Sequence, residues 1–306
     1  MEKEIYIIGA GPAGITAGIY ALRSKIKTTI IEKFSPGGNM LITETIENYP
    51  GFPDGITGLE LAERMKKQFL NLGGEIITKE VVDIDLKKDR KTIFLSDGKF
   101  IDTDVVIIAT GSSRKKLGVK GEDIFVGKGV SYCAVCDGFF FKDKTIAVIG
   151  GGDSALKEAI YLTRFVNRCY LVHRREQFRG SKYLQELIEK NEKISPIVPF
   201  VVEEIIGKEK VEYLLLRNTK TDEKMELKVD GIFISVGQKP NVEFLKGKLK
   251  SNPSGYLIVN EKMETSTKGV FACGDVIKKD LYQIITACGE GAIAAFFAEK
   301  YLDSLD

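Results

Sequence analysis

The chain has 306 residues, a length that predicts two domains, each able to bury its own core. Hydrophobic residues make up 43% and charged residues 29%, a globular composition that excludes a disordered tail, a collagen-like chain and a coiled coil. The 45 basic and 43 acidic residues give a net charge of +2, so we expect no nucleic-acid partner and no membrane attraction. Partners are therefore expected at local sites.

Cysteine content and apolar patterning predict the compartment. Five cysteines is an odd number, which argues against a secreted disulfide scaffold and favours a reducing compartment, by default the cytoplasm. The apolar stretch before the first glycine motif is too short for a signal-peptide core. No run approaches 18 uncharged apolar residues, so we expect no membrane span.

The first 31 residues predict a strand, a glycine turn, a helix and a second strand, which together form a βαβ unit. In its Gly-x-Gly-x-x-Gly motif, Gly9 permits the tight turn, Gly11 lets the backbone approach a pyrophosphate, and Gly14 lets the helix pack on the sheet. Glu32, 21 residues beyond Gly11, is expected to accept hydrogen bonds from a ribose diol. The alternative is a structural turn with a surface glutamate.

A second βαβ unit begins at Thr145 and has the turn Gly150-Gly-Gly152-Asp-Ser-Ala155. At the strand end where the first unit has its glutamate, this unit has His173 followed by Arg174, Arg175 and Arg179. Arginine forks suit phosphate oxygens, so we interpret this cluster as a site for the 2′-phosphate of NADP. The alternative is a solvated basic face on the next helix.

Each unit ends in short alternating runs and a buried strand that returns to the sheet. Because the second unit already closes near residue 237, the C-terminal segment and its helix over 283–302 are expected to rejoin the first domain. The prediction is an α/β protein with two Rossmann-like dinucleotide-binding domains. The second domain, 114–242, is inserted into the first, 1–113 and 243–306.

Cys133-Ala-Val-Cys136 precedes the second unit and is followed by Asp137. We expect no metal site, because zinc needs further ligands and the sequence holds one histidine and no second cysteine pair. Two buried structural thiols are one interpretation. The other is a redox dithiol, in which a lowered thiol pKa makes one sulfur an effective attacker and Asp137 passes the proton that disulfide reduction consumes.

An acidic ribose contact, an NADP-type basic contact and a dithiol in one chain imply a path for electrons. A flavin is the natural carrier between nicotinamide and a disulfide. The sequence therefore predicts an oxidoreductase with two nucleotide cofactors.

The sequence resembles the low-molecular-weight thioredoxin reductases of bacteria and archaea over nearly its whole length. The resemblance lies in Gly9-Ala-Gly-Pro-Ala-Gly14, Glu47-Asn-Tyr-Pro-Gly51, Ala109-Thr-Gly111, Ser131-Tyr-Cys133-Ala-Val-Cys136-Asp-Gly138, Gly150-Gly-Gly-Asp-Ser-Ala155, His173-Arg-Arg175 with Arg179, and Gly269-Val-Phe-Ala-Cys-Gly-Asp275. It implies FAD in the split domain, NADPH in the inserted domain, thioredoxin as the disulfide substrate, and a homodimer.

The resemblance also implies roles for single residues. Cys136 would face the flavin, Cys133 would attack thioredoxin, and Asp137 would donate and accept the proton. The FAD site would be formed by Gly9, Gly11, Pro12, Ala13, Gly14, Glu32, Lys33, Gly37, Gly38, Asn39, Asn48, Val82, Thr110, Gly111, Gly274, Asp275, Gln283 and Ile284. The NADPH site would be formed by Gly150, Gly152, Asp153, Ser154, Ala155, His173, Arg174, Arg175 and Arg179.

Three positions depart from the usual pattern of that family: Tyr282 stands for an arginine, Asn39 for a glutamine and Lys157 for a glutamate. They bear on the flavin surroundings and on nicotinamide docking. A related flavin disulfide oxidoreductase that uses ferredoxin as donor or a glutaredoxin-like acceptor is the alternative, although the intact second glycine motif favours NADPH. An alternative of another class is a non-catalytic redox sensor. Relatives with an attached N-terminal dithiol domain are not expected, because the sequence opens at its first nucleotide strand.

Overall fold

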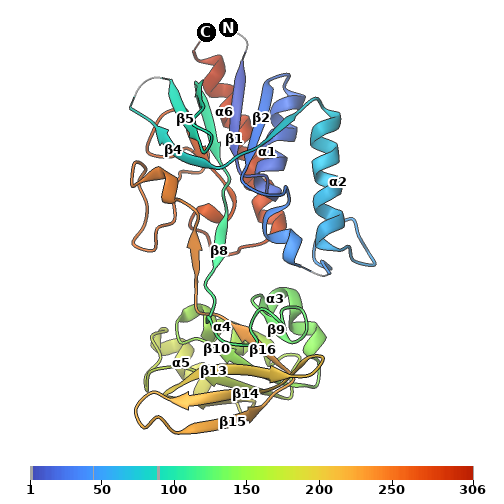
Figure 1. Cartoon of the computed structure of the whole chain (residues 1–306), viewed down its shortest axis with the longest axis vertical. Coiled ribbons are helices and arrows are strands. Elements are labelled where there is room, and N and C mark those ends of the chain that lie inside the picture. Colours follow the sequence, from blue (N-terminus) through green and yellow to red (C-terminus); the bar gives the residue numbers. More distant parts are fainter. Residues whose placement is uncertain (1–2, 44, 88–89, 306) are drawn as a thin grey trace. The chain divides into compact units, whose positions relative to one another are not determined.

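A computed structural model describes residues 3–43, 45–87 and 90–305. The chain forms two compact units, Met1–Ser113 with Lys239–Asp306, and Arg114–Gln238 (Figure 1). The sequence of the second unit is thus inserted into that of the first, and the chain re-enters unit 1 at residue 239 rather than at 243. Both passages between the units run through short strands that pair with each other, β8 (Ser112–Arg114) and β17 (Gln238–Pro240).

Unit 1 is built on a five-stranded parallel sheet with the order β18-β7-β1-β2-β3. Its strands are β1 (Glu4–Ile8), β2 (Lys27–Glu32), β3 (Glu75–Thr78), β7 (Val105–Ile108) and β18 (Val270–Ala272). Strand β7 is buried along its whole length, which explains why it is apolar at every position.

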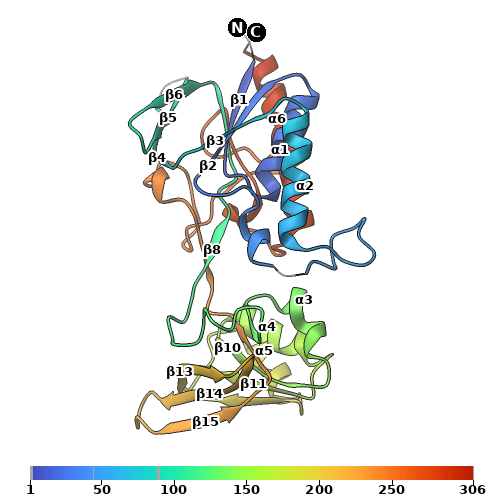
Figure 2. The ribbon, with the colours of Figure 1, turned by 45° about the vertical axis from the view of Figure 1, so that its right-hand side comes forward.

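The two faces of this sheet pack against different layers. Helices α1 (Pro12–Arg23), α2 (Gly58–Asn71) and α6 (Ile284–Asp303) share one core with Ile5 and Ile7 of β1, and Figure 2 shows these helices together on one side of the sheet. Ile8 points to the other face, where the antiparallel strands β4 (Val81–Asp85), β5 (Lys91–Leu95) and β6 (Phe100–Thr103) form the covering layer. The alternation along β1 thus fixes which layer each side chain meets.

Unit 2 repeats this plan with the strand order β12-β11-β10-β16-β9, again all parallel. The strands are β9 (Val130–Ser131), β10 (Thr145–Ile149), β11 (Arg168–Val172), β12 (Ile194–Ile197) and β16 (Gly231–Ile234). Helices α4 (Asp153–Leu162) and α5 (Lys182–Glu189) pack on one face of this sheet. The antiparallel strands β13 (Phe200–Gly207), β14 (Val211–Asn218) and β15 (Lys224–Lys228) pack on the other.

Short helices complete both units. They are η1 (Gly38–Ile42), η3 (Glu243–Leu245) and η4 (Gly274–Val276) in unit 1, and α3 (Ala134–Asp137) and η2 (Gly138–Phe141) in unit 2. The parallel sheets with their glycine turns confirm the predicted fold class, an α/β protein with two Rossmann-like dinucleotide-binding halves.

Candidate functional site

The glycine turn of unit 1 connects β1 to α1 and has the form that a pyrophosphate requires. Gly9 has φ +105°, and a Cβ there would lie 2.5 Å from the Ala109 carbonyl oxygen. A Cβ on Gly14 would lie 1.9 Å from the Gly9 oxygen, whereas a Cβ on Gly11 would meet nothing within 4 Å. Gly11 is the N-cap of α1 and offers no side chain, and Pro12 at the first helical position has no N–H, so the N–H groups that follow Pro12 are the ones open to an anion.

Glu32 ends strand β2, and its carboxylate is held by the turn. One oxygen accepts a hydrogen bond from the Ala10 N–H at 2.8 Å, and the other accepts from the Phe34 N–H at 3.0 Å. A carboxylate accepts about four hydrogen bonds, so it keeps capacity for a ribose diol. Lys33, the next residue, forms an ion pair with Glu80 at 2.6 Å. This pair places Glu80, two residues before the exposed Val82, next to the end of β2.

The strand end of β7 is pinned by a residue that the sequence did not single out. Asn241 accepts at its backbone oxygen from the Thr110 hydroxyl at 2.7 Å and donates from its side chain to the Thr110 oxygen at 2.8 Å. Asn39 donates to the Ser112 oxygen at 3.1 Å. Gly38 lies against the first turn, because a Cβ there would be 3.2 Å from the Gly11 Cα. The Gly37–Asn39 and Thr110–Gly111 segments therefore both adjoin the first turn.

The C-terminal segment reaches the same place. Gly274 has φ +78°, and a Cβ there would lie 2.8 Å from the Ala13 Cβ, so η4 touches the first turn. Gln283 is the N-cap of α6, directly before Ile284, and its side-chain oxygen accepts from the Asn48 amide at 2.9 Å. Asp275 forms an ion pair with Lys279 at 3.1 Å, a lysine that the sequence interpretation missed. Unit 1 thus brings Gly38, Thr110 and Gly274 from three separate segments against its first glycine turn, and the open turn with the Glu32 acceptor fits a dinucleotide such as FAD.

The glycine turn of unit 2 has the same construction. Gly150 has φ +157°, and a Cβ there would lie 2.4 Å from the Ser235 oxygen, whereas a Cβ on Gly152 would meet nothing within 4 Å. Gly152 is the N-cap of α4, whose first turn contains Asp153, Ser154 and Ala155. The Asp153 carboxylate accepts from the Ser181 N–H at 2.7 Å, which ties the next loop to this turn.

His173 packs against the glycine turn of unit 2 at Gly151. The residue is 5% exposed. Its ring stacks on Phe178 with centroids 5.7 Å apart, and a Cβ on Gly151 would approach Nδ1 to 2.4 Å. Burial, together with the charges of the three neighbouring arginines, lowers the pKa of His173. The ring is therefore uncharged at neutral pH and adds no positive charge to the cluster.

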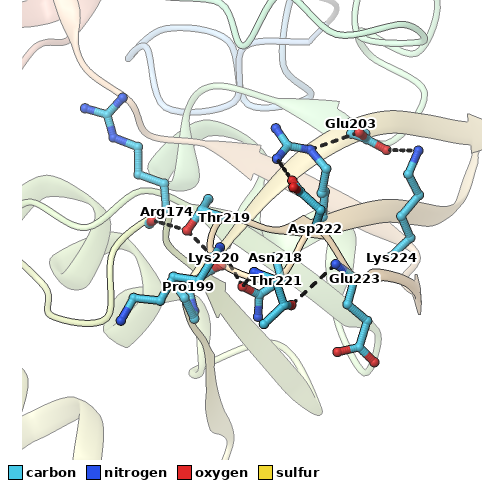
Figure 3. Close-up of polar contacts among 11 residues, drawn as sticks. Arg174, Pro199, Glu203, Asn218, Thr219, Lys220, Thr221, Asp222, Glu223 and Lys224 are labelled. Atoms are coloured by element: carbon cyan, nitrogen blue, oxygen red, sulfur yellow. Dashed lines mark hydrogen bonds and ion pairs between the residues drawn. The ribbon is translucent and has the colours of Figure 1, made fainter.

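The arginines supply the positive charge. Arg174, Arg175 and Arg179 are exposed, and the backbone N–H groups of Arg179 and Gly180 donate to the Gly151 oxygen at 2.6 and 3.1 Å. The turn between β14 and β15 lies beside this loop, because the Thr219 hydroxyl donates to the Arg174 oxygen at 3.1 Å (Figure 3). Three exposed guanidinium groups near an open glycine turn fit a nucleotide with an additional phosphate.

Cys133 and Cys136 form a disulfide at the start of α3. The Cys136 N–H donates to the Cys133 sulfur at 3.2 Å, a contact that favours negative charge on that sulfur when the pair is reduced. The other cysteines, Cys169, Cys273 and Cys288, are free and buried, and burial raises the pKa of Cys169 to about 12. Only the Cys133–Cys136 pair therefore has the environment of reactive sulfur among these five residues.

A serine links this disulfide to the predicted proton donor. The Ser131 hydroxyl donates to the Asp137 carboxylate at 2.6 Å and accepts from the Cys133 N–H at 3.0 Å. Asp137 is thereby fixed beside the Cys133 backbone. Ser131 was visible in the sequence as part of the cysteine motif, but no feature of that motif assigned it a role.

Within residues 3–43, 45–87 and 90–305, no cluster of three or more His, Cys, Asp or Glu side chains is suited to a metal ion. In the same part of the chain, no helix combines the length and the apolar character that crossing a bilayer requires.

Known proteins of similar sequence and structure include several thioredoxin reductases. The thioredoxin reductase of Streptomyces coelicolor is 44% identical over 305 residues, which are 99% of this chain and 95% of that protein. The thioredoxin reductase of Rickettsia conorii is 43% identical over 307 residues, with 99% of each chain covered. The crystal structure of thioredoxin reductase from Streptococcus pyogenes has a TM-score of 0.94 at 44% identity, covering 99% of this chain and 100% of that one.

These similarities confirm the resemblance expected from the motifs. The family model described as pyridine nucleotide-disulphide oxidoreductase matches residues 3–291. The chain therefore belongs to the pyridine nucleotide-disulphide oxidoreductase family.

Proposed function

We propose that this protein is an FAD-dependent thioredoxin reductase that passes electrons from NADPH to its Cys133–Cys136 disulfide and then to thioredoxin. The observation that carries the proposal is this disulfide. It lies in unit 2, whose glycine turn adjoins three exposed arginines. Relatives of 41–44% identity that bear the name thioredoxin reductase support it.

The two nucleotides would bind in different units. Unit 1 offers the open turn at Gly11 and the Glu32 carboxylate for FAD, and unit 2 offers the turn at Gly152 and the arginine cluster for NADPH. When bound, FAD supplies a carrier that takes two electrons from a nicotinamide and gives two to a disulfide.

The side chains of this protein then carry out the sulfur chemistry. Two electrons break the Cys133–Cys136 bond, and Asp137, held by Ser131, delivers one proton, leaving a thiol and a thiolate. The Cys133 thiolate attacks one sulfur of the thioredoxin disulfide, which forms a mixed disulfide and releases the other thioredoxin sulfur as a thiolate. Cys136 loses its proton to Asp137 and displaces thioredoxin from Cys133, so the internal disulfide re-forms and thioredoxin leaves with two reduced sulfurs.

Apolar side chains next to the disulfide favour a protein as the acceptor. Val135, Phe139 and Phe140 are 47%, 61% and 50% exposed, and all lie within four residues of Cys136. Large apolar groups gathered on a surface are typical of a protein contact. We propose that they receive the surface around the thioredoxin disulfide.

We propose that the protein works as a homodimer in the cytoplasm. Ile285, Ile293 and Phe296 of α6 are 46%, 39% and 48% exposed, which provides apolar surface for a second copy. The free state of the three buried cysteines suits a reducing compartment.

Thioredoxin reduction with purified protein tests the function. NADPH and thioredoxin should support turnover in the wild type, whereas Cys133→Ser and Cys136→Ser should each reduce it to background because the internal disulfide cannot form. Full activity in either variant would contradict the proposal. A panel with reduced ferredoxin as donor and a glutaredoxin-like protein as acceptor separates related reductases, and turnover only with those partners would also contradict it.

A further inference from the structure

A lysine with little exposed surface lies between two carboxylates in unit 1. The Lys279 ammonium is 3.1 Å from an Asp275 oxygen and 2.9 Å from a Glu290 oxygen. The side chains of Lys279, Glu290 and Asp275 are 10%, 15% and 25% exposed, so water screens these charges only in part. In such a group, removing one partner costs much more than losing a surface ion pair.

The lysine joins separate elements. Glu290 belongs to α6, and the oxygen that binds Lys279 also accepts from the Gly274 N–H of η4 at 2.9 Å. The Lys279 ammonium also lies 5.5 Å from the centre of the Tyr282 ring, a cation–π contact directly before Gln283. One side chain thus holds the start of α6, η4 and the connection between them.

Lys279 is the cation that offsets the charge of these two carboxylates, and the group as a whole keeps one negative charge. Burial raises the pKa of Glu290, the Asp275 charge raises it further, and Lys279 and the Gly274 N–H oppose the rise. Two carboxylates that share one ammonium repel each other once the ammonium is removed. Asp275 would then turn from its position or take up a proton.

We propose that Lys279 is a positioning residue for FAD: it holds Asp275 and the start of α6 in the arrangement that binds the cofactor. Its neighbour Lys278 is exposed, so Lys279 is the cation of this segment that lies against the two carboxylates. The inference rests on the proposed function, because Asp275 and Gln283 are FAD residues only under that proposal.

Titration of FAD into apoprotein, followed by flavin fluorescence, tests the role. Lys279→Met should weaken FAD binding about tenfold or more, because it leaves two enclosed carboxylates without a cation. Lys279→Arg should keep the dissociation constant within about threefold of the wild type, because the charge is retained. Lys278→Met is the matched control: Lys278 is exposed and donates to a backbone oxygen, and its loss should leave the constant unchanged.

A double variant shows whether FAD affinity is lost because of the uncompensated charge or because the protein fails to fold. Lys279→Met with Glu290→Gln has the same net charge as the wild-type group, and the glutamine still accepts from the Gly274 N–H. It should recover most of the FAD affinity that Lys279→Met loses, and it decides the test if the single variant does not fold. A folded double variant without FAD affinity would overturn the inference.

Two other results would overturn the inference. One is wild-type FAD affinity in Lys279→Met, and the other is an equal loss in Lys279→Arg and Lys279→Met. If these occur while the wild type binds FAD, the proposed function stands and only the role of Lys279 falls. A wild-type protein that does not bind FAD overturns both.

Discussion

The two glycine turns of this chain occupy the same place between a strand and a helix and have opposite charges at the neighbouring strand end. In unit 1 the turn at Gly9 is followed at the end of β2 by Glu32, whose carboxylate accepts from the Ala10 N–H of that turn. In unit 2 the turn at Gly150 is followed at the end of β11 by His173 and three exposed arginines. Under the proposed function, the turn would bind a pyrophosphate in either unit, and the strand end would distinguish one nucleotide from the other.

The two units differ in which side chain braces the glycine turn and which is available to a nucleotide. His173 occupies the position after its strand that corresponds to Glu32, yet its ring is buried beneath Gly151 and uncharged. In unit 1 a carboxylate both braces the turn and stays available to a ligand. In unit 2 the imidazole braces the turn, and under the proposed function the exposed arginines beyond it would recognise the nucleotide.

The largest expected effects come from the turns themselves. Gly9→Ala should abolish FAD binding and spare the affinity of unit 2 for 2′,5′-ADP, because the new Cβ would meet the Ala109 oxygen at 2.5 Å. Gly150→Ala should abolish 2′,5′-ADP binding and spare FAD binding, because its Cβ would meet the Ser235 oxygen at 2.4 Å. Calorimetric titration with each ligand measures both constants. Gly98→Ala is the control for backbone strain, because Gly98 has φ +83° and a Cβ there would meet nothing within 4 Å. Loss of 2′,5′-ADP binding in Gly9→Ala, or of FAD binding in Gly150→Ala, would contradict the comparison.

The arginines should give the next largest effect. Arg174→Ala and Arg175→Ala should each weaken NADPH binding roughly 10- to 100-fold, because a charge-assisted hydrogen bond contributes about 1.5–3 kcal/mol. NADH binding should change little, because NADH lacks the 2′-phosphate. Fluorescence titration with both nucleotides measures the ratio. Equal losses for NADPH and NADH would show that these arginines do not recognise the additional phosphate.

Glu32 should show the corresponding effect in unit 1. Glu32→Gln removes the charge that strengthens its hydrogen bonds, so FAD should dissociate about tenfold more readily, which corresponds to about 1.4 kcal/mol. NADPH binding should be unchanged. Equilibrium dialysis of FAD measures the effect, and an unchanged FAD constant would leave Glu32 as a brace for the turn alone.

The smallest effect concerns the pH dependence of stability. The folded-state pKa of His173 is lowered, so the unfolded chain binds more protons and the stability contribution is lost as pH falls below the ordinary value of 6.5. His173→Phe keeps an aromatic ring on Phe178 and removes the titration. Between pH 7.5 and 5.5 the midpoint of thermal unfolding of the wild type should therefore fall a few degrees further than that of the variant. Parallel curves would show that His173 is not the responsible group.

The sequence predicted the parts of the fold that have a strong local signal. The strands at 5–8 and 146–149 are apolar and largely buried, and both precede glycine turns, so their position and role were evident. Strand β3 was not anticipated, because its four residues are only half-buried or exposed and have little apolar pattern. Strand β6 was missed for a similar reason, since Phe100 is exposed and three of its four residues are not buried.

The site was predictable where a motif carries the chemistry and not where distant residues complete it. The Cys133–Cys136 pair and the glycine turns could be identified within short windows of sequence. Asn241 acts on Thr110 across 131 positions, and no local pattern connects them. Lys279 lies near its partners in sequence, but its role depends on burial between η4 and α6, which only the packed structure shows.

The central claim is that electrons enter from a nucleotide recognised by the Arg174 cluster and reach the Cys133–Cys136 disulfide through FAD in unit 1. An anaerobic titration of the purified holoprotein with NADPH and, separately, with NADH tests it most directly, with flavin absorbance as the readout. We expect NADPH to bleach the flavin at a much lower concentration than NADH. A flavin that neither nucleotide reduces, or that both reduce at the same concentration, would contradict the account.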